Sequence, residues 1–318
     1  MTRSMAVKGL LALLVTIVFV AIVRRLIDPA ALIDQIRSSD PWWLALGVCC
    51  VVAMTCLRAI RLCVVLKGNL DAGLFMASVV HNASTAVLPM KLGEFALPLL
   101  LSRLGHSGIS AGLGTLLLLR ALDMVVVVVL GSLASAMALR SMGHPSADVG
   151  WTLLIASVAA CLAVGLSWNR MTSKLHGSRL LDAAPGPLRN IVLAATQVPA
   201  VRLARAGLLS FLAWVALIAA FYCLSNAIGH RVDVWQAGAI GAAAALAFAF
   251  PVSGVANVGP FQAAWVWMSV VLGMGANQAL TASLVAHGIV VIATSLLALL
   301  MAPSLLTRMR LARAPRTT

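Results

Sequence analysis

The chain has 318 residues, of which 62% are hydrophobic and only 10% are charged, and its mean hydropathy is +1.02. A soluble domain carries about 25% charged residues because its surface must face water, so this composition excludes a water-soluble globule. The formal net charge of +14 lies in short segments between apolar runs rather than on one basic arm. We attribute it to membrane topology, in which Lys and Arg collect on the cytoplasmic side, and expect no nucleic-acid partner.

Long apolar runs follow one another along the chain, and roughly 20 apolar residues are enough for a helix to cross the hydrocarbon layer. In chain order we predict about six full spans, over residues 8–23, 42–66, 109–139, 150–168, 206–228 and 279–302. The predicted fold class is therefore all-α. It is a polytopic transmembrane helix bundle in which residues 1–318 form a single integral membrane domain.

Two further apolar segments, residues 73–102 and 235–274, contain residues that break a membrane helix. The first is interrupted by His81, Asn82, Pro89, Lys91, Gly93, Glu94 and Pro98. The second is interrupted by Pro251, Gly254, Gly259 and Pro260. Non-helical backbone at membrane depth persists only where it is buried in protein or lines a water-filled cavity, so both segments are candidates for the walls of a site.

The distribution of basic residues predicts how these segments are oriented. With both termini cytoplasmic, the basic segment 169–205 and the basic tail 303–318 lie inside. The opposite loops then hold only Arg24, Arg25, Arg37, Arg140 and Arg231. Segment 73–102 begins and ends inside, and segment 235–274 begins and ends outside. We therefore expect two re-entrant or broken-helix hairpins of opposite orientation, typical of transporters built from inverted repeats, although no residue-level repeat is visible.

Four charged residues are predicted at membrane depth: Lys91, Glu94, Arg120 and Asp123. An ionisable side chain there costs at least ~2.5–3.5 kcal/mol, so its presence needs a partner or a function. Lys91 and Glu94 are three residues apart, as are Arg120 and Asp123, and this spacing puts two side chains on one helix face. We predict two local ion pairs. They are either structural links or the lining of a polar cavity that receives a charged headgroup.

Three polar residues near the first break join the predicted substrate-binding set. Arg58 and Arg61 end the second predicted span. Their side chains either extend to the cytoplasmic interface or contact lipid phosphates. Asn82 precedes the break itself.

Ser253, Asn257 and Gln262 surround the second break and complete the set. A helix that starts near Pro260 would direct free N–H groups at an anion such as phosphate. A kink that only improves helix packing is the alternative interpretation.

No catalytic or cofactor motif accompanies these residues. The six cysteines form no CxxC pair, the six histidines form no HExxH motif, and no P-loop sequence occurs. Each of these patterns carries a specific metal or phosphate chemistry. We therefore expect no metal, no cofactor and no enzymatic activity. His287 stands alone on an apolar helix, and we expect it to pack or to make a hydrogen bond.

Three stretches, in order, resemble motifs of one family, and the resemblance covers about residues 40–302. The stretch Leu88-Pro-Met-Lys-Leu-Gly-Glu94 resembles the Pro-x-[Arg/Lys]-x-Gly-Glu box of the lysylphosphatidylglycerol synthase transmembrane-domain family. Arg120-Ala-Leu-Asp123 resembles its Glu-Arg-x-x-Asp helix motif. The stretch from Pro251 to Gly259, Pro-Val-Ser-Gly-Val-Ala-Asn-Val-Gly, resembles its late Pro-x-x-Gly-Gly-x-Gly-x-x-Glu break.

The resemblance implies a flippase-like integral membrane protein of a family whose members occur beside hopanoid and glycolipid pathways. Leu119 stands where the family usually has Glu, Gln262 stands near the place of the late Glu, and Ala96 or Leu97 near that of a second Arg. These departures imply a changed or neutral substrate headgroup. Because the chain ends at Thr318, we expect no aminoacyl-transferase domain and no lipid aminoacylation by this chain itself.

We expect a lipid translocase or lipid-transport protein of the bacterial inner membrane that moves an amphipathic, phosphate-bearing lipid. Lys91 and Arg120 would meet the phosphate, while Glu94 and Asp123 hold them in place or contact a cationic part. Two alternatives stay open: an integral membrane enzyme of a polyprenyl-phosphate, hopanoid or glycolipid pathway, and a scaffold for a lipid-modifying complex. The expected partners are the lipid, a separately encoded lipid-modifying transferase and a second copy of the chain.

Overall fold

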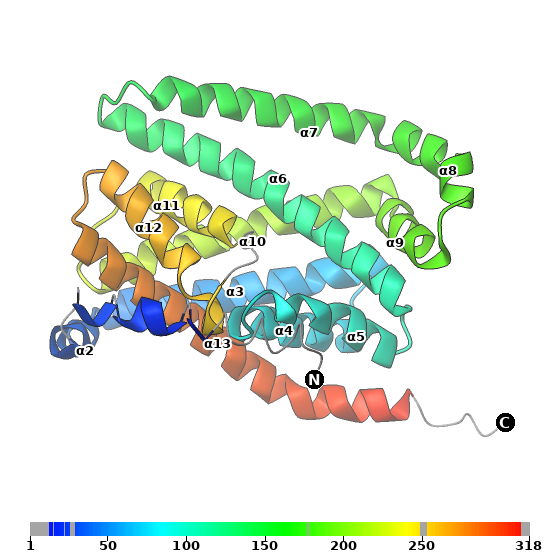
Figure 1. Ribbon diagram of the computed structural model, residues 1–318, viewed down its shortest axis with the longest axis horizontal. Coiled ribbons are helices and arrows are strands. Elements are labelled where there is room, and N and C mark those ends of the chain that lie inside the picture. The colour runs from blue at the N-terminus through cyan, green and yellow to red at the C-terminus, as the bar shows by residue number, and fades with distance from the viewer. Residues whose placement is uncertain are drawn as a thin grey trace.

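The computed structural model describes residues 13–312 except 15, 22, 26–28, 177 and 249–252. These residues form helices, turns and loops, and no strand, which confirms the all-α prediction. The helices, shown in Figure 1, are α2 (Pro29–Arg37), α3 (Pro41–Leu66), α4 (Ala72–Val87), η1 (Leu92–Phe95), α5 (Ala96–Arg103), α6 (Ile109–Ser141), α7 (Ala147–His176), α8 (Arg179–Asp182), α9 (Gly186–Thr196), α10 (Ala200–Ala227), α11 (Val234–Ala247), η2 (Val255–Asn257), α12 (Pro260–Val271) and α13 (Ala276–Leu311).

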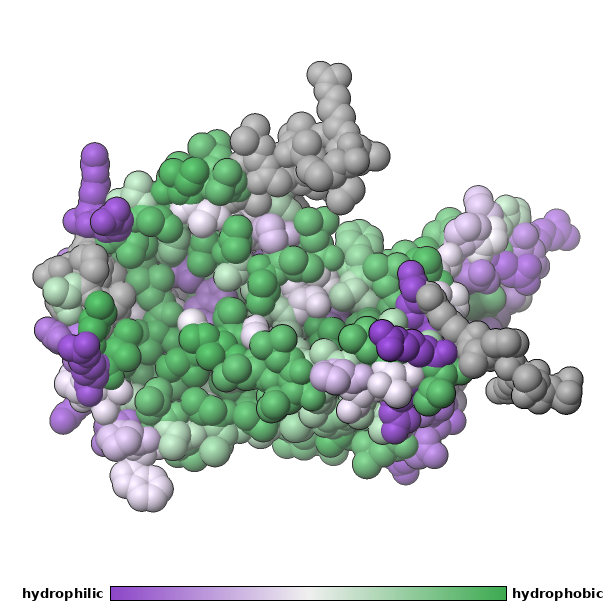
Figure 2. Space-filling model, turned by 90° about the horizontal axis from the view of Figure 1, so that it is seen from below, coloured by the Kyte–Doolittle hydropathy of each residue, from purple (hydrophilic) through white to green (hydrophobic). Residues whose placement is uncertain are grey.

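Five of these helices, α3, α6, α7, α10 and α13, are long and apolar enough to cross a membrane. The first predicted span, 8–23, lies largely outside the described residues, and its described parts are helical. In Figure 2, hydrophobic side chains form a broad central band and hydrophilic ones gather at both ends of the long axis, as expected for helices that cross a bilayer along that axis. The basic segment 169–205 is mostly helical, because α7 extends into it and α8, α9 and the start of α10 follow.

Aspartates in the loops set where three helices begin. The Asp40 side chain accepts from the N–H of Trp42 at 2.8 Å, at the start of α3. Asp71 caps α4 in the same way, and Asp233 forms a capping box with Gln236 at the start of α11. Such a side chain satisfies backbone N–H groups that the helix itself leaves free. These loop carboxylates therefore have structural roles at the ends of the helices.

The antiparallel helices α3 and α10 pack along their whole length at the centre of the bundle (Figure 1). At one end, the Asp40 N–H donates to the Ala227 carbonyl at 2.8 Å. At the other end, a Cβ on Gly68 would lie 3.0 Å from the Arg202 side chain. The hairpin α4–α5 starts near Gly68, and the hairpin α11–α12 starts near Ala227. The two hairpins therefore enter the bundle from opposite ends, as predicted.

One arrangement of helices occurs twice along the chain, the second time in inverted orientation. A long helix, a hairpin of short helices and a second long helix occur as α3, α4–α5, α6 and again as α10, α11–α12, α13. The last helix of each half packs on the first hairpin helix of the other half, α6 on α11 and α13 on α4. The predicted inverted repeat is thus present in the order and packing of the helices.

Small residues allow the two halves to approach closely. A Cβ on Gly131 of α6 would lie 2.6 Å from that of Ala242 in α11, and one on Gly238 of α11 would lie 2.8 Å from that of Ala134. Small residues are the usual means of bringing helix backbones together in a membrane. The small-residue run of α11 thus forms part of the contact between the halves.

Candidate functional site

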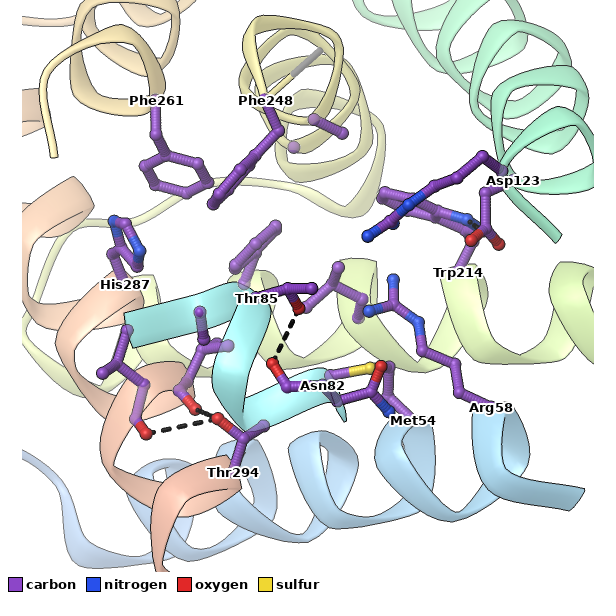
Figure 3. Close-up of a pocket in the computed structure, with 18 of the residues that line it drawn as sticks. Met54, Arg58, Asn82, Thr85, Asp123, Trp214, Phe248, Phe261, His287 and Thr294 are labelled. Atoms are coloured by element: carbon purple, nitrogen blue, oxygen red, sulfur yellow. Dashed lines mark hydrogen bonds between the residues drawn. The ribbon is translucent and has the colours of Figure 1, made fainter. Parts of the chain in front are cut away.

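A cavity of about 380 Å³ lies between the two inverted halves. Its walls come from α3, α4, η1 and α6 of the first half and from α10, α11, α12 and α13 of the second. Figure 3 shows Arg58, Asp123 and Trp214 on one side and Phe248, Phe261 and His287 on the other. The cavity therefore has a charged side and an aromatic side.

Six of the ten predicted site residues line this cavity: Arg58, Asn82, Lys91, Glu94, Arg120 and Asp123. They come from four separate elements of the first half, which the fold brings together. The remaining predicted residues are Arg61, Ser253, Asn257 and Gln262, and they do not line it. Each of these four contacts something else.

The carboxylates pair across helices rather than along the chain. Arg120 donates to both oxygens of Glu94, from Nε at 2.9 Å and from Nη2 at 2.6 Å. Asp123 pairs with Arg61. The prediction of the local pairs Lys91–Glu94 and Arg120–Asp123 was therefore wrong, because each carboxylate pairs with a different residue.

The backbone explains why Lys91 and Glu94 do not share a helix face. Lys91 has φ +59° and ψ +15°, which is left-handed backbone, and only then does the short 3₁₀-helix η1 begin. The three-residue spacing places side chains together only in a continuous helix. Arg120 and Asp123 do lie in one continuous helix, but each binds a partner on a different neighbouring element.

Asp123 is almost completely buried, with 2% of its surface exposed, and both of its oxygens accept hydrogen bonds. Arg61 donates to both of them, and Trp214 Nε1 donates to Oδ1 at 3.1 Å. Arg61 also donates to Ser210 Oγ at 2.6 Å. A buried charge is tolerated when its hydrogen-bonding groups are satisfied in this way. Arg61 thus stands behind the cavity wall and holds Asp123.

Arg58 and Lys91 form no ion pair with a carboxylate of the described residues. The Arg58 guanidinium lies 5.4 Å from the centroid of the Trp214 ring, and Lys91 Nζ lies 4.9 Å from that of Phe248. Cation–π contacts of this kind stabilise a cation without neutralising it. Both side chains therefore keep an uncompensated positive charge at the cavity wall.

The tips of the two hairpins are hydrogen-bonded to each other. Asn257 Nδ2 donates to the carbonyls of Thr85 and Ala86, the latter at 3.2 Å. Ser253 Oγ accepts from the Met90 N–H at 3.3 Å and donates to Asn257 Oδ1 at 3.0 Å. Ser253 and Asn257 are thus engaged with the other hairpin. Pro251, part of the same predicted break, lies outside the described residues.

Both tips contain left-handed backbone at residues other than glycine. Met90 and Lys91 have φ of +54° and +59°, and Ala256 and Asn257 both have φ of +54°. This conformation is costly for an L-residue with a side chain and is frequent at functional sites. The matching strain in the two halves marks the tip-to-tip contact as a specific feature of the fold.

Gln262 connects the start of α12 to the aromatic side of the cavity. Its Oε1 accepts from the Gly259 N–H at 2.9 Å, and its Nε2 lies 2.9 Å from His287 Nδ1. The helix does begin at Pro260, as predicted. The His287 ring lies 4.5 Å from that of Phe261, which agrees with the prediction that His287 packs or makes a hydrogen bond.

Sequence reasoning missed the aromatic and neutral members of the lining, including Trp214, Phe221, Phe248, Phe261 and Thr294. They are scattered through apolar helices of the second half, where an aromatic side chain gives the same signal as a packing residue. The hydrogen bond from Trp214 to Asp123 and the contact of Lys91 with Phe248 distinguish two of them, and each joins residues far apart in the sequence.

Residues 9–298 match the family described as "Lysylphosphatidylglycerol synthase TM region". No curated protein matches the chain, and no solved structure does. The match covers most of the chain, including both hairpins and every residue of the cavity lining. The chain therefore belongs to this family and is an integral membrane protein.

Proposed function

We propose that this protein moves an amphipathic, phosphate-bearing lipid between the leaflets of a bacterial inner membrane. The observation that carries the proposal is the pair of uncompensated cations, Arg58 and Lys91, at the wall of a cavity between two inverted halves. A charged side chain at this depth is energetically costly, so its presence points to a function. A phosphate group that enters the cavity would supply the missing negative charge.

Arg58 and Lys91 would hold the phosphate, because charge-assisted hydrogen bonds to phosphate oxygens are among the strongest that side chains make. Arg120 and Glu94 would keep each other in position at the wall. The acyl tails would stay in the bilayer. The inverted halves support alternating exposure, since rocking one repeat against the other is the common mechanism of such folds.

We propose no chemical step on the lipid. Each carboxylate of the cavity lining, and thus each candidate general base there, is already bound to an arginine of the protein. Glu94 accepts two hydrogen bonds from Arg120, and Asp123 accepts from Arg61 and Trp214.

Both termini would lie in the cytoplasm. A separately encoded transferase that makes the lipid would be a natural partner.

Transport in proteoliposomes tests the proposal. Fluorescent phosphatidylglycerol is placed in both leaflets, and a membrane-impermeant reductant reports how fast it reaches the outer leaflet. We expect the double variant Arg58→Gln/Lys91→Gln to lower the initial rate about 10-fold or more, since hydrogen bonds to charged groups contribute about 1.5–3 kcal/mol each. The exposed Lys174 serves as the control, and Lys174→Gln should retain the rate. Equal rates for all three proteins would refute the proposal.

A further inference from the structure

Glu94 and Asp123 are the two carboxylates of the cavity lining, and both are already occupied by the protein's own cations. Arg120 donates to each oxygen of Glu94, and Arg61 donates to each oxygen of Asp123. A lipid headgroup with an ammonium group would have to compete with an arginine for one of them. Displacement of Arg61 would leave its guanidinium without its carboxylate in a buried site, which is unfavourable.

The aromatic rings offer no better place for a cation. Recognition of ammonium groups by aromatic side chains needs a free ring face. Arg58 lies over Trp214, Lys91 lies over Phe248, and the His287 ring packs against Phe261. The protein's own groups thus already contact three of the four aromatic rings that line the cavity, which leaves fewer ring faces for an ammonium group.

The charges around the cavity also favour an anion. Arg58, Arg61, Lys91 and Arg120 face Glu94 and Asp123, which leaves an excess of two positive charges in this part of the described structure. Opposite charge in a ligand is attracted by this excess and like charge is repelled, which is the usual basis of charge discrimination. A doubly negative headgroup would neutralise it, and a singly negative one would halve it.

Two unpartnered donors add to this preference. Asn82 Nδ2 and His287 Nε2 are buried and make no hydrogen bond. Gln262 uses its oxygen for the Gly259 N–H, so its amide nitrogen donates to His287 Nδ1, and Nε2 therefore carries the ring proton. Unpaired buried donors are costly, and acceptor oxygens are the groups that satisfy them. The oxygens of a phosphate or a polyol are such groups.

We infer that the cavity selects lipids whose headgroup has a net negative charge and excludes headgroups that carry an ammonium group. This inference rests on the proposed function and narrows its substrate class. The favoured chemistry is a phosphodiester or phosphomonoester whose remainder is uncharged, such as a polyol. An aminoacylated phosphodiester, in which one added ammonium group neutralises the phosphate and a second outweighs it, is excluded.

Binding in detergent separates this inference from transport. Short-chain phosphatidylglycerol, lysyl-phosphatidylglycerol and phosphatidylethanolamine with the same acyl tails are titrated into the purified protein and followed by native mass spectrometry. We expect phosphatidylglycerol to bind about 10-fold or more tightly than either of the others, because like-charge contacts suppress the wrong ligand. Equal binding, or tighter binding of a lipid with an ammonium group, would overturn the inference.

The variant Lys91→Glu gives a more stringent test, because it reduces the excess of two positive charges around the cavity to zero. We expect it to remove the preference for phosphatidylglycerol, whereas the exposed Lys174→Glu control keeps it. If Lys91→Glu does not fold, Lys91→Gln should reduce the preference part of the way. If a folded Lys91 variant keeps the preference for phosphatidylglycerol, the cavity charge does not select the headgroup and the inference is rejected. Selective binding without transport would refute the proposed function alone, and transport without charge preference would refute the inference alone.

Discussion

Asn257 Nδ2 donates to the carbonyl oxygen of Thr85, which joins two hairpin tips that are 172 positions apart in the chain. The same amide donates to Ala86, and its oxygen accepts from Ser253. This side chain therefore links the two halves of the bundle at the level where both helices are broken. Its loss should weaken the contact between the halves more than it disturbs either hairpin.

We expect Asn257→Ala to lower the free energy of unfolding by about 1–3 kcal/mol, because it leaves buried carbonyls unpaired. Alanine also tolerates φ +54° less well than asparagine does. Asn257→Gly is the matched variant, since glycine adopts this backbone freely and loses only the hydrogen bonds. Chemical unfolding in detergent micelles should therefore rank wild type above the glycine variant, and the glycine variant above alanine. Wild-type stability in Asn257→Gly would contradict the role of the hydrogen bonds.

The ion pair between Glu94 and Arg120 can be measured by a double-mutant cycle. With Glu94→Gln and Arg120→Gln, we expect a coupling energy of about 1 kcal/mol or more in unfolding experiments, as for residues in direct contact. The cycle of Glu94→Gln with Lys91→Gln is the control, because Lys91 forms no ion pair with Glu94. A greater coupling energy of Glu94 with Lys91 than with Arg120 would contradict the ion pair described here and support the local pair that the sequence suggests.

Asp123→Asn should be the most destabilising single substitution at the site. It leaves the Arg61 guanidinium buried without a counter-charge, and loss of one partner of a buried pair costs about 3–5 kcal/mol. Removal of both charges in Asp123→Leu/Arg61→Leu should recover part of this stability. Thermal unfolding of the purified variants measures both effects, and a double variant less stable than Asp123→Asn would argue against a buried pair.

Close packing between the halves gives a prediction that does not involve charge. Gly131→Ala would place a Cβ 2.6 Å from the Cβ of Ala242, whereas Gly207→Ala meets nothing within 4 Å. We expect the first substitution to cost about 1–3 kcal/mol through overpacking. The second should cost no stability, because alanine is the better helix former. If thermal unfolding shows the two variants to be equally stable, α6 and α11 do not approach as closely as described.

The parts of the fold that depend on local signals could be predicted from the sequence. Apolar length identified the five spans that the structure describes, and the breaks at Pro89 and Pro260 identified the hairpins, because proline and glycine act on the backbone where they stand. The basic loops indicated that the two hairpins have opposite orientation. The helix ends were predicted less well. Helix α7 continues past the predicted 168 to His176, with no proline or glycine in between, and α13 continues past the predicted 302 to Leu311 in spite of Pro303.

The partners of the charged residues could not be predicted. Glu94 lies three residues from Lys91 and 26 from Arg120, yet it pairs with Arg120. Spacing limits partners only within one continuous helix, and the left-handed backbone at Lys91 removes that condition. A partner on another helix depends on how the helices pack, which hydrophobic periodicity does not specify. The aromatic side of the cavity was missed for the same reason.

The inverted halves are alike in shape and unlike in chemistry. The ionisable side chains that line the cavity on the charged side lie between residues 58 and 123, in the first half, and the second half contributes rings, aliphatic and small residues and the Thr294 hydroxyl. In a rocking motion, a bound anion would travel with the first half while the second half slides past it. Under the proposed function, the protein would then present different surfaces to the two leaflets, and its affinity for the lipid need not be the same on the two sides.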